Sequence, residues 1–258
     1  MSAPGLFSLN GKTALVTGAA GLVGRQIALA LAQAGATTFL AGRSIGKLET
    51  EACALRKQGY DVAALSYDQT REDSIRALRD EVLNRAKRLD VLVNNAVGRP
   101  MKDWTSPAGD FASSMEVNAT GVFMMIRTFG EAMAAQGAGS ILNIGSIQGM
   151  VGPDFTLYEG LDWGVPPDYF FHKGGLILLT RFAAAKLGPR GIRVNVVSPG
   201  GFFNHQDPAF VQRYNARTFL GRMASATDLM GVVVFLASDA SSYITGANIP
   251  VDGGYTAK

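Results

Sequence analysis

Short apolar runs alternate along the chain with longer segments in which apolar residues recur at helical spacing. A short run of β-branched and apolar residues bounded by glycine or polar residues predicts a buried strand. Such runs occupy residues 12–17, 36–41, 62–66, 90–93, 140–144 and 192–197. Apolar residues three and four positions apart predict helices over residues 22–34, 48–58, 72–87, 111–135 and 169–187.

This alternation predicts one doubly wound α/β domain of the Rossmann type. Strands that are joined through helices lie parallel, with right-handed crossovers and helices on both faces of the sheet. The 258 residues suit a single domain covering 1–258, because no internal repeat or linker divides them. Ligands of such sheets bind at the carboxyl ends of the strands, so the residues that follow each strand are the candidates for a site.

Composition narrows the classes of function. The net charge of +3 comes from 24 Lys and Arg interspersed with 21 Asp and Glu, so a nucleic-acid partner is not expected. Cys53 is the only cysteine, which excludes an intramolecular disulfide, and no metal site is predicted. No stretch approaches the ~20 apolar residues of a membrane span, and no basic leader with an apolar core is present. We therefore expect a cytoplasmic protein without a membrane partner.

A glycine-rich turn joins the first predicted strand to the first predicted helix, where residues 17–24 read TGAAGLVG. Glycines allow a tight turn and a close approach of the backbone, and the N-terminus of the following helix offers free N–H groups to a pyrophosphate. The turn therefore predicts dinucleotide binding. The residues predicted to contact the dinucleotide there are Gly18, Gly21, Leu22, Val23 and Gly24.

The end of the second predicted strand bears on the choice of nicotinamide cofactor. In dinucleotide folds an acidic residue at this point binds the ribose 2′-hydroxyl, whereas a basic residue accommodates a 2′-phosphate. Gly42 stands where the acid would be, and Arg43 and Ser44 follow it, both able to hold a phosphate. NADP is therefore the preferred prediction, with NAD as the alternative.

Tyr169 and Lys173 lie four positions apart in a predicted helix, one turn from each other on the same face. A phenol that exchanges protons near neutral pH needs its pKa lowered from about 10, and a nearby ammonium acts in this direction. Ser146 follows the strand at 140–144, so its hydroxyl lies where it could hydrogen-bond a substrate carbonyl oxygen. These residues predict acid–base catalysis of alcohol oxidation or ketone reduction.

Taken together, the motifs resemble those of the classical short-chain dehydrogenase/reductase family. The resemblance rests on the glycine turn, NNA at 94–96, GS at 145–146, YFFHK at 169–173, SPG at 198–200, YITG at 243–246 and VDGG at 251–254. It covers nearly the whole chain. Two positions depart from the family pattern, since Leu22 replaces the middle glycine of TGxxxGxG and Val97 replaces the glycine of NNAG.

The resemblance implies a sheet in the order 3-2-1-4-5-6-7, a homotetramer or homodimer, and hydride transfer between the nicotinamide and a substrate carbon. It implies catalytic roles for Asn118, Ser146, Tyr169 and Lys173, with Lys173 also holding the nicotinamide ribose. Further cofactor contacts that it implies, besides Tyr169 and Lys173, are Asp68, Gln69, Asn95, Ala96, Pro199, Gly200 and Phe202.

The region between Ser146 and Tyr169 indicates a substrate class. These residues are 23 positions apart, more than in classical relatives, which marks residues 150–167 as an insertion beside the site. The insertion mixes aromatic rings, which pack on sugar C–H groups, with carboxylates, which accept hydroxyl hydrogen bonds. Residues 201–223 form a second candidate substrate loop, and arginines near the site could pair with a substrate carboxylate. We predict a sugar, sugar acid or related polyol, contacted by Arg99, Ser146, Gln148, Tyr158, Trp163, His205 and Arg213.

Other interpretations stay open. A ketoacyl-thioester reductase uses the same scaffold, although it would require a basic patch for its carrier protein. A noncatalytic dinucleotide-binding protein is a further alternative, against which the presence of Asn118, Ser146, Tyr169 and Lys173 argues. The insertion could also pack against a neighbouring subunit rather than act as a lid.

Overall fold

The computed structural model describes residues 2–257 and contains one seven-stranded parallel sheet in the order β3-β2-β1-β4-β5-β6-β7. This order is the one that the resemblance to the short-chain dehydrogenase/reductase family implies. All neighbouring strands pair in parallel, and the central strands are buried along their whole length. The strands are β1 (Thr13–Thr17), β2 (Thr37–Gly42), β3 (Val62–Ser66), β4 (Val91–Asn94), β5 (Gly139–Ile144), β6 (Ile192–Pro199) and β7 (Asn248–Val251).

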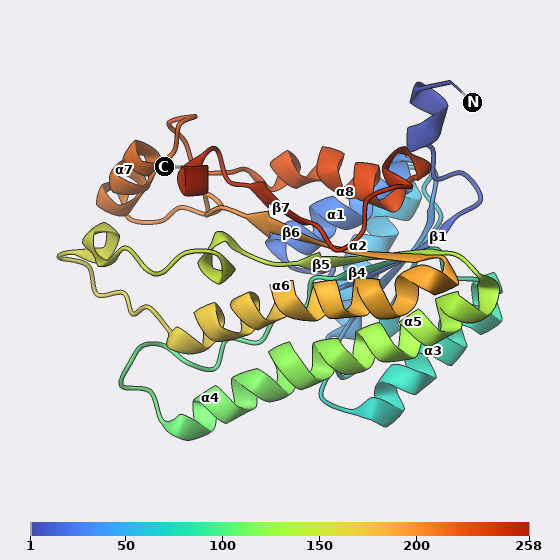
Figure 1. Ribbon diagram of the computed structural model, residues 1–258, viewed down its shortest axis with the longest axis horizontal. Helices are drawn as coiled ribbons and strands as arrows, with labels where there is room; N and C mark the ends of the chain where they lie inside the picture. The colour runs from blue at the N-terminus through green and yellow to red at the C-terminus, as the bar shows by residue number, and fades with distance from the viewer. Residues whose placement is uncertain (1, 258) are drawn as a thin grey trace.

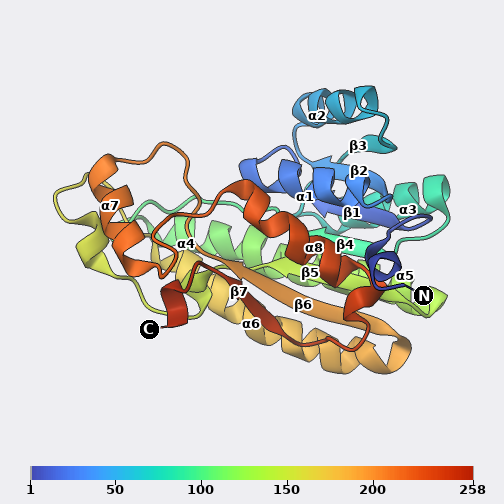
Figure 2. The same cartoon turned by 90° about the horizontal axis from the view of Figure 1, so that it is seen from above.

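Helices cover both faces of the sheet (Figures 1 and 2). Alternate residues of β1 point to opposite sides: Ala14 and Val16 belong to the core under one helical layer, and Leu15 to the core under the other. The first layer consists of α1 (Leu22–Gln33), α2 (Ile45–Lys57) and α8 (Met230–Ala237). The second consists of α3 (Glu72–Ala86), α4 (Ala108–Met115), α5 (Val122–Gln136) and α6 (Pro167–Leu187).

The predicted strands and helices agree with the structure except in one place. The sequence predicts a single helix over residues 111–135. The structure instead contains three consecutive elements there: α4, a π-helical turn at Glu116–Gly121, and α5. At Gly121 a side chain would meet the backbone oxygen of Gln69 at 2.6 Å, so this turn packs directly against the loop after β3. Such a contact between distant segments leaves no trace in the spacing of apolar residues.

A third group of buried apolar residues lies beyond the sheet, at the carboxyl ends of its strands. It joins residues of the segment 147–161 to α7 (Pro208–Arg217) and to Met223. In both views α7 and the segment that leads into α6 lie side by side at one end of the molecule. Across residues 2–257 no helix is long and apolar enough to cross a membrane, and no cluster of His, Cys, Asp and Glu could hold a metal ion.

Candidate active site

The glycine turn between β1 and α1 is held by hydrogen bonds to the loop after β4. The backbone N–H groups of Asn95 and Ala96 donate to the hydroxyl of Thr17 at 3.0 and 3.1 Å. The amide of Asn95 donates to the carbonyl oxygens of Thr17 and Gly18 at 3.0 and 3.2 Å. Gly18 has a φ of +62°, a conformation that glycine adopts without strain. Asn95 and Thr17 therefore hold the glycine turn against the loop after β4, and the contact of Asn95 with the cofactor stays a prediction.

The N-terminus of α1 fits the pyrophosphate of a dinucleotide. Gly21 precedes the helix with no side-chain cap, and its first turn carries no acidic residue. The N–H groups of Leu22 and Val23 thus face outward from a positive dipole end, where a phosphate would accept their hydrogen bonds. At Gly24 a side chain would meet the carbonyl oxygen of Gly18 at 2.3 Å, so this close-packed turn requires glycine.

The end of β2 fits an additional phosphate. Arg43 is exposed, and no hydrogen bond or ion pair engages its guanidinium within residues 2–257. Ser44 precedes α2 without capping it, which leaves its hydroxyl free beside Arg43. Asp68 accepts hydrogen bonds from Thr70, and these lower the pKa of the Asp68 carboxyl, with a smaller contribution from the charge of Arg43.

Gln69 is bonded within the protein at both ends of its side chain. It accepts a hydrogen bond from the hydroxyl of Tyr67 at 2.7 Å and donates to the backbone oxygen of Val117 at 2.9 Å. The side chain therefore links the loop after β3 to the π-helical turn. Its contact with the cofactor stays a prediction.

Tyr169 lies in the first turns of α6, which begins at Pro167 as expected for a proline at a helix start. The ammonium of Lys173 is 5.5 Å from the centroid of the Tyr169 ring, and the guanidinium carbon of Arg99 is 4.8 Å from it. Lys173 is buried and donates to the backbone oxygen of Ile144 at 2.6 Å. Burial lowers the pKa of the Lys173 ammonium, the charge of Arg99 lowers it further, and Tyr169 raises it.

Ser146 follows β5 and is buried, with its hydroxyl accepting a hydrogen bond from the backbone N–H of Gln148 at 3.1 Å. The turn that it starts lies tightly against α6: a side chain at Gly149 would meet the backbone of Lys173 at 2.6 Å. Gly149 therefore allows the serine turn to approach the helix that carries Tyr169. The sequence pattern does not single out Gly149, because one more glycine in a glycine-rich chain is no signal by itself.

Asn118 is buried in the π-helical turn, and its amide binds the loop after β4. It accepts a hydrogen bond from the N–H of Gly98 at 2.9 Å and donates to the Gly98 oxygen at 2.8 Å and to the hydroxyl of Ser114 at 3.0 Å. The hydroxyl of Ser114 in turn donates to the carboxylate of Asp168. Neither Ser114 nor Asp168 was predicted, since an acid in the first turn of a helix is typical of exposed helix starts.

His172 lies between Tyr169 and Lys173 in the sequence but is buried in contact with the edge of the Tyr169 ring, 5.1 Å between centroids. Burial lowers the pKa of His172 to about 3, and the charges of Lys173 and Arg99 add to the effect. The imidazole is therefore neutral at ordinary pH. Its Nε2 has no partner among the described residues.

The predicted cofactor residue Pro199 ends β6, and Gly200 and Phe202 lie in the loop that follows. The N–H of Gly200 donates to the oxygen of Val251 at 3.0 Å, so β7 holds this loop in place. Phe202 packs partly against the core on the α1 side of the sheet. These residues lie at the carboxyl edge of the sheet, as the glycine turn does.

The predicted insertion packs against α7 through aromatic rings. The ring of Trp163 is 4.8 Å from that of Phe210 and 5.8 Å from that of Tyr158. The guanidinium of Arg213 donates to the backbone oxygen of Glu159 at 2.6 Å, and Arg217 pairs with Asp154 at 2.8 Å. Arg213 thus holds the insertion itself, and its contact with substrate stays a prediction. The predicted insertion and the second candidate substrate loop therefore pack together. We call their joint surface the aromatic wall (residues 154–163 and 208–217).

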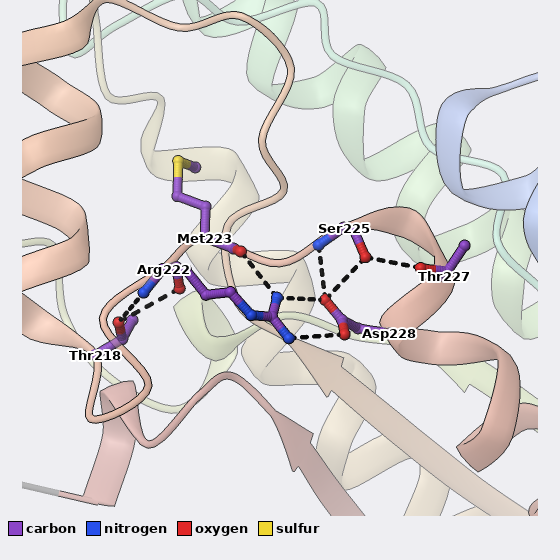
Figure 3. A network of polar contacts seen from close by, with 6 residues as sticks. All are labelled: Thr218, Arg222, Met223, Ser225, Thr227 and Asp228. Carbon is purple, nitrogen blue, oxygen red and sulfur yellow. Dashed lines mark hydrogen bonds and ion pairs between the residues drawn. The ribbon is translucent and has the colours of Figure 1, made fainter.

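The end of the candidate substrate loop is anchored by an ion pair (Figure 3). Arg222 binds both carboxylate oxygens of Asp228 at 2.7 and 2.9 Å, and Ser225 also donates to this carboxylate. These bonds lower the pKa of Asp228 to about 2. The loop is therefore attached firmly at its C-terminal end, whereas His205, near its N-terminal end and before α7, is exposed, has a positive φ of 58° and contacts the ring of Phe203.

The chain is similar to known proteins over nearly its whole length. The sequence profile of the family described as Enoyl-(Acyl carrier protein) reductase matches residues 18–256. Galactitol 2-dehydrogenase (L-tagatose-forming) of Cereibacter sphaeroides is 34% identical over 97% of this chain and 97% of its own length. A 3-oxoacyl-(acyl-carrier-protein) reductase of Aquifex aeolicus is 34% identical over 95% of this chain and 98% of its own.

A solved structure shares the whole fold. The gluconate 5-dehydrogenase of Burkholderia cenocepacia, determined in complex with NADP and tartrate, superimposes with a TM-score of 0.91 at 31% identity over 100% of both chains. Both the sequence match and the fold match extend over the segments that build the site. The chain therefore belongs to the short-chain dehydrogenase/reductase family and is an NAD(P)-dependent oxidoreductase that acts on CH–OH groups.

Proposed function

We propose that this protein is an NADP-preferring dehydrogenase of a sugar acid or of a related sugar or polyol. The observation that carries the proposal is the free guanidinium of Arg99 beside the ring of Tyr169. An exposed guanidinium that makes no hydrogen bond or ion pair within the protein can bind a carboxylate in a planar geometry with two hydrogen bonds. A hydroxy acid held in this way would bring its secondary alcohol toward the phenol of Tyr169.

The proposed chemistry uses residues at the carboxyl edge of the sheet. When bound, the nicotinamide accepts or supplies the hydride. Tyr169 takes the proton of the alcohol during oxidation and returns it during reduction, while Ser146 hydrogen-bonds the substrate oxygen. Lys173 holds the nicotinamide ribose and keeps a positive charge beside Tyr169. Asn118 positions the loop that carries Arg99.

The preference for NADP rests on Arg43 and Ser44 at the end of β2, where no acid is present to bind a ribose 2′-hydroxyl. The NADP held by the gluconate 5-dehydrogenase agrees with this proposal. NAD stays the second choice. Self-association as a homotetramer or homodimer is also part of the proposal, and light scattering of the purified protein tests it.

The aromatic wall supports a polyhydroxylated substrate. Tyr158 and Trp163 present ring faces and edges next to the acidic residues of the insertion, a combination that suits alternating C–H and hydroxyl groups. Gluconate and galactitol, the substrates in the names of two relatives, are molecules of this kind.

The test is a turnover assay with gluconate, galactitol and xylitol, each with NADP and with NAD. We expect oxidation of at least one of them, faster with NADP. Arg99→Gln should raise the KM for a carboxylate substrate about ten- to a hundredfold, the scale of a charge-assisted hydrogen bond, and leave the KM for a neutral polyol nearly unchanged. Absence of turnover with every sugar-derived compound would exclude the proposal.

One observation favours a second candidate, a 3-oxoacyl-thioester reductase. A pocket of about 470 Å³ opens beside the serine turn and is lined mainly by apolar side chains, among them Trp104, Phe155 and Phe170. Such a pocket suits an acyl chain better than a polyol. Reduction of a 3-oxoacyl thioester by NADPH, weakened by Trp104→Ala but unaffected by Arg99→Gln, would favour this candidate.

A further inference from the structure

Asp168 is a buried carboxylate directly before Tyr169. Only 2% of its surface is exposed, and one of its oxygens, Oδ1, has no partner among the described residues. Burial of a carboxyl group with so few hydrogen bonds destabilises the folded protein. The presence of Asp168 at this position is therefore better explained by a role in positioning other residues than by a contribution to stability.

A directed series of hydrogen bonds runs from Asp168 to the loop after β4. The hydroxyl of Ser114 donates to Asp168, the amide of Asn118 donates to Ser114 at 3.0 Å, and the N–H of Gly98 donates to Asn118 at 2.9 Å. Ser114 is fully buried and Asn118 nearly so, which keeps water from replacing these partners.

Asp168 fixes the direction of the whole series. Ser114 is the donor in its hydrogen bond to Asp168, so its hydroxyl proton points toward the carboxyl group. The Ser114 oxygen is then left to accept from the NH₂ group of Asn118. This in turn places the Asn118 carbonyl oxygen opposite the N–H of Gly98, as observed. If the Asn118 amide were flipped, its NH₂ group would face the N–H of Gly98, and two donors would oppose each other.

The series ends next to the residue that contacts Tyr169. Gly98 precedes Arg99, whose guanidinium lies over the Tyr169 ring, and Tyr169 follows Asp168 on α6. The residues thus form a closed ring through three segments that are separate in the sequence, 98–99, 114–118 and 168–169. We propose that Asp168 is a positioning residue for the reaction, which acts through Ser114 and Asn118 to hold the loop after β4, and with it Arg99, against Tyr169.

The first experiment is kinetic and uses the full-length protein. Asp168→Ala and Ser114→Ala should each lower kcat about ten- to a hundredfold, the scale of a small misplacement of reacting groups. The Kd for NADPH should stay within about twofold of wild type, because the phosphate-binding turns are not touched. The double variant should be no slower than the slower single variant, since both changes break one series. Asp168→Asn keeps an acceptor oxygen and should recover most of the activity.

The assay uses gluconate with NADP, or a 3-oxoacyl thioester with NADPH if only that compound is turned over. The proposal rests on the family activity and not on the substrate class. A failure of the sugar assignment would appear in the wild type itself, whereas a failure of the present proposal would appear only in the variants.

The second experiment needs no substrate. Hydrogen exchange of a peptide covering residues 96–101 reports on the Gly98 N–H, which should exchange faster in Asp168→Ala and Ser114→Ala than in wild type. Asp90→Ala is the matched control: this carboxylate is also buried but binds Arg88 and the N–H of Thr13, at the opposite edge of the sheet. The control should lower Tm and change neither kcat nor exchange at 96–101.

These outcomes distinguish a positioning role of Asp168 from a purely stabilising one. If Asp168→Ala behaves as Asp90→Ala does, with a lower Tm but unchanged kcat and exchange, Asp168 has a structural role only and the proposal is wrong. Additive losses of kcat in the double variant would also contradict it. If Asp168→Ala does not fold, the smaller change Ser114→Ala carries the same expectations and decides the question.

Discussion

Arg99 lies over the ring of Tyr169, with its guanidinium carbon 4.8 Å from the ring centroid, while Lys173 approaches the same ring to 5.5 Å. One cation is exposed and the other is buried. The buried ammonium is held by the backbone of Ile144, whereas no hydrogen bond or ion pair engages the exposed guanidinium in the described chain. This asymmetry agrees with the proposed roles, in which Lys173 acts beside Tyr169 and Arg99 is available to a ligand.

Tyr169→Phe should keep cofactor binding and lower kcat by about two to four orders of magnitude, because a positioned acid–base group contributes ~10²- to 10⁴-fold. Stopped-flow or steady-state rates together with calorimetric NADPH binding measure the two effects. Tyr243→Phe is the control, since Tyr243 is fully exposed, and it should leave kcat unchanged. Near-normal turnover by Tyr169→Phe would contradict the assignment.

Arg43→Ala should weaken NADPH binding by roughly 1–3 kcal/mol and leave NADH binding almost unchanged, because only NADPH carries the phosphate that a free guanidinium would bind. Calorimetry with both cofactors measures this difference. Lys57→Ala removes a positive charge at the other end of α2 and should affect neither cofactor. Tighter binding of NADH than of NADPH by the wild type would show that the cofactor preference is wrong.

Trp163→Ala should raise the KM for the sugar-derived substrate while cofactor affinity stays the same, because the ring packs between Tyr158 and Phe210 in the aromatic wall. Initial rates over a range of substrate and cofactor concentrations provide both constants. Trp163→Phe retains an aromatic ring and should restore most of the affinity. Equal changes in both constants would instead indicate a general disturbance of the fold.

His172 should make the protein less stable as the pH falls below its unfolded-state pKa of about 6.5. Burial holds the pKa of His172 in the folded protein at about 3, so between these values the unfolded chain binds a proton that the folded chain does not. The free energy of unfolding then decreases on acidification by up to about 1.4 kcal/mol per pH unit. Urea unfolding at pH 7 and pH 5.5 measures the change, which His172→Gln should reduce. An equal pH dependence in both proteins would exclude this origin.

The sequence by itself determined the strands and helices as far as β6, apart from the division between α4 and α5, together with the glycine turn and the spacing of Tyr169 and Lys173, whereas α7, α8 and β7 became visible only in the structure. These features are local. The spacing of apolar residues within a short segment distinguishes a strand from a helix. Tyr169 and Lys173 lie on the same face of α6 because they are one helical turn apart. The sheet order needed the resemblance to a family as well, since periodicity alone does not say which strands are neighbours.

Tertiary structure alone decided which of the candidate residues are free and which are already engaged. Arg99 and Arg213 look alike in the sequence, yet one lies open beside Tyr169 and the other binds the backbone of Glu159. Asp168 has the sequence pattern of an exposed acid at a helix start, but α4 covers it and Ser114 bonds to it. Such differences arise from contacts between segments more than fifty positions apart, and the pattern of residues along one segment carries no information about them.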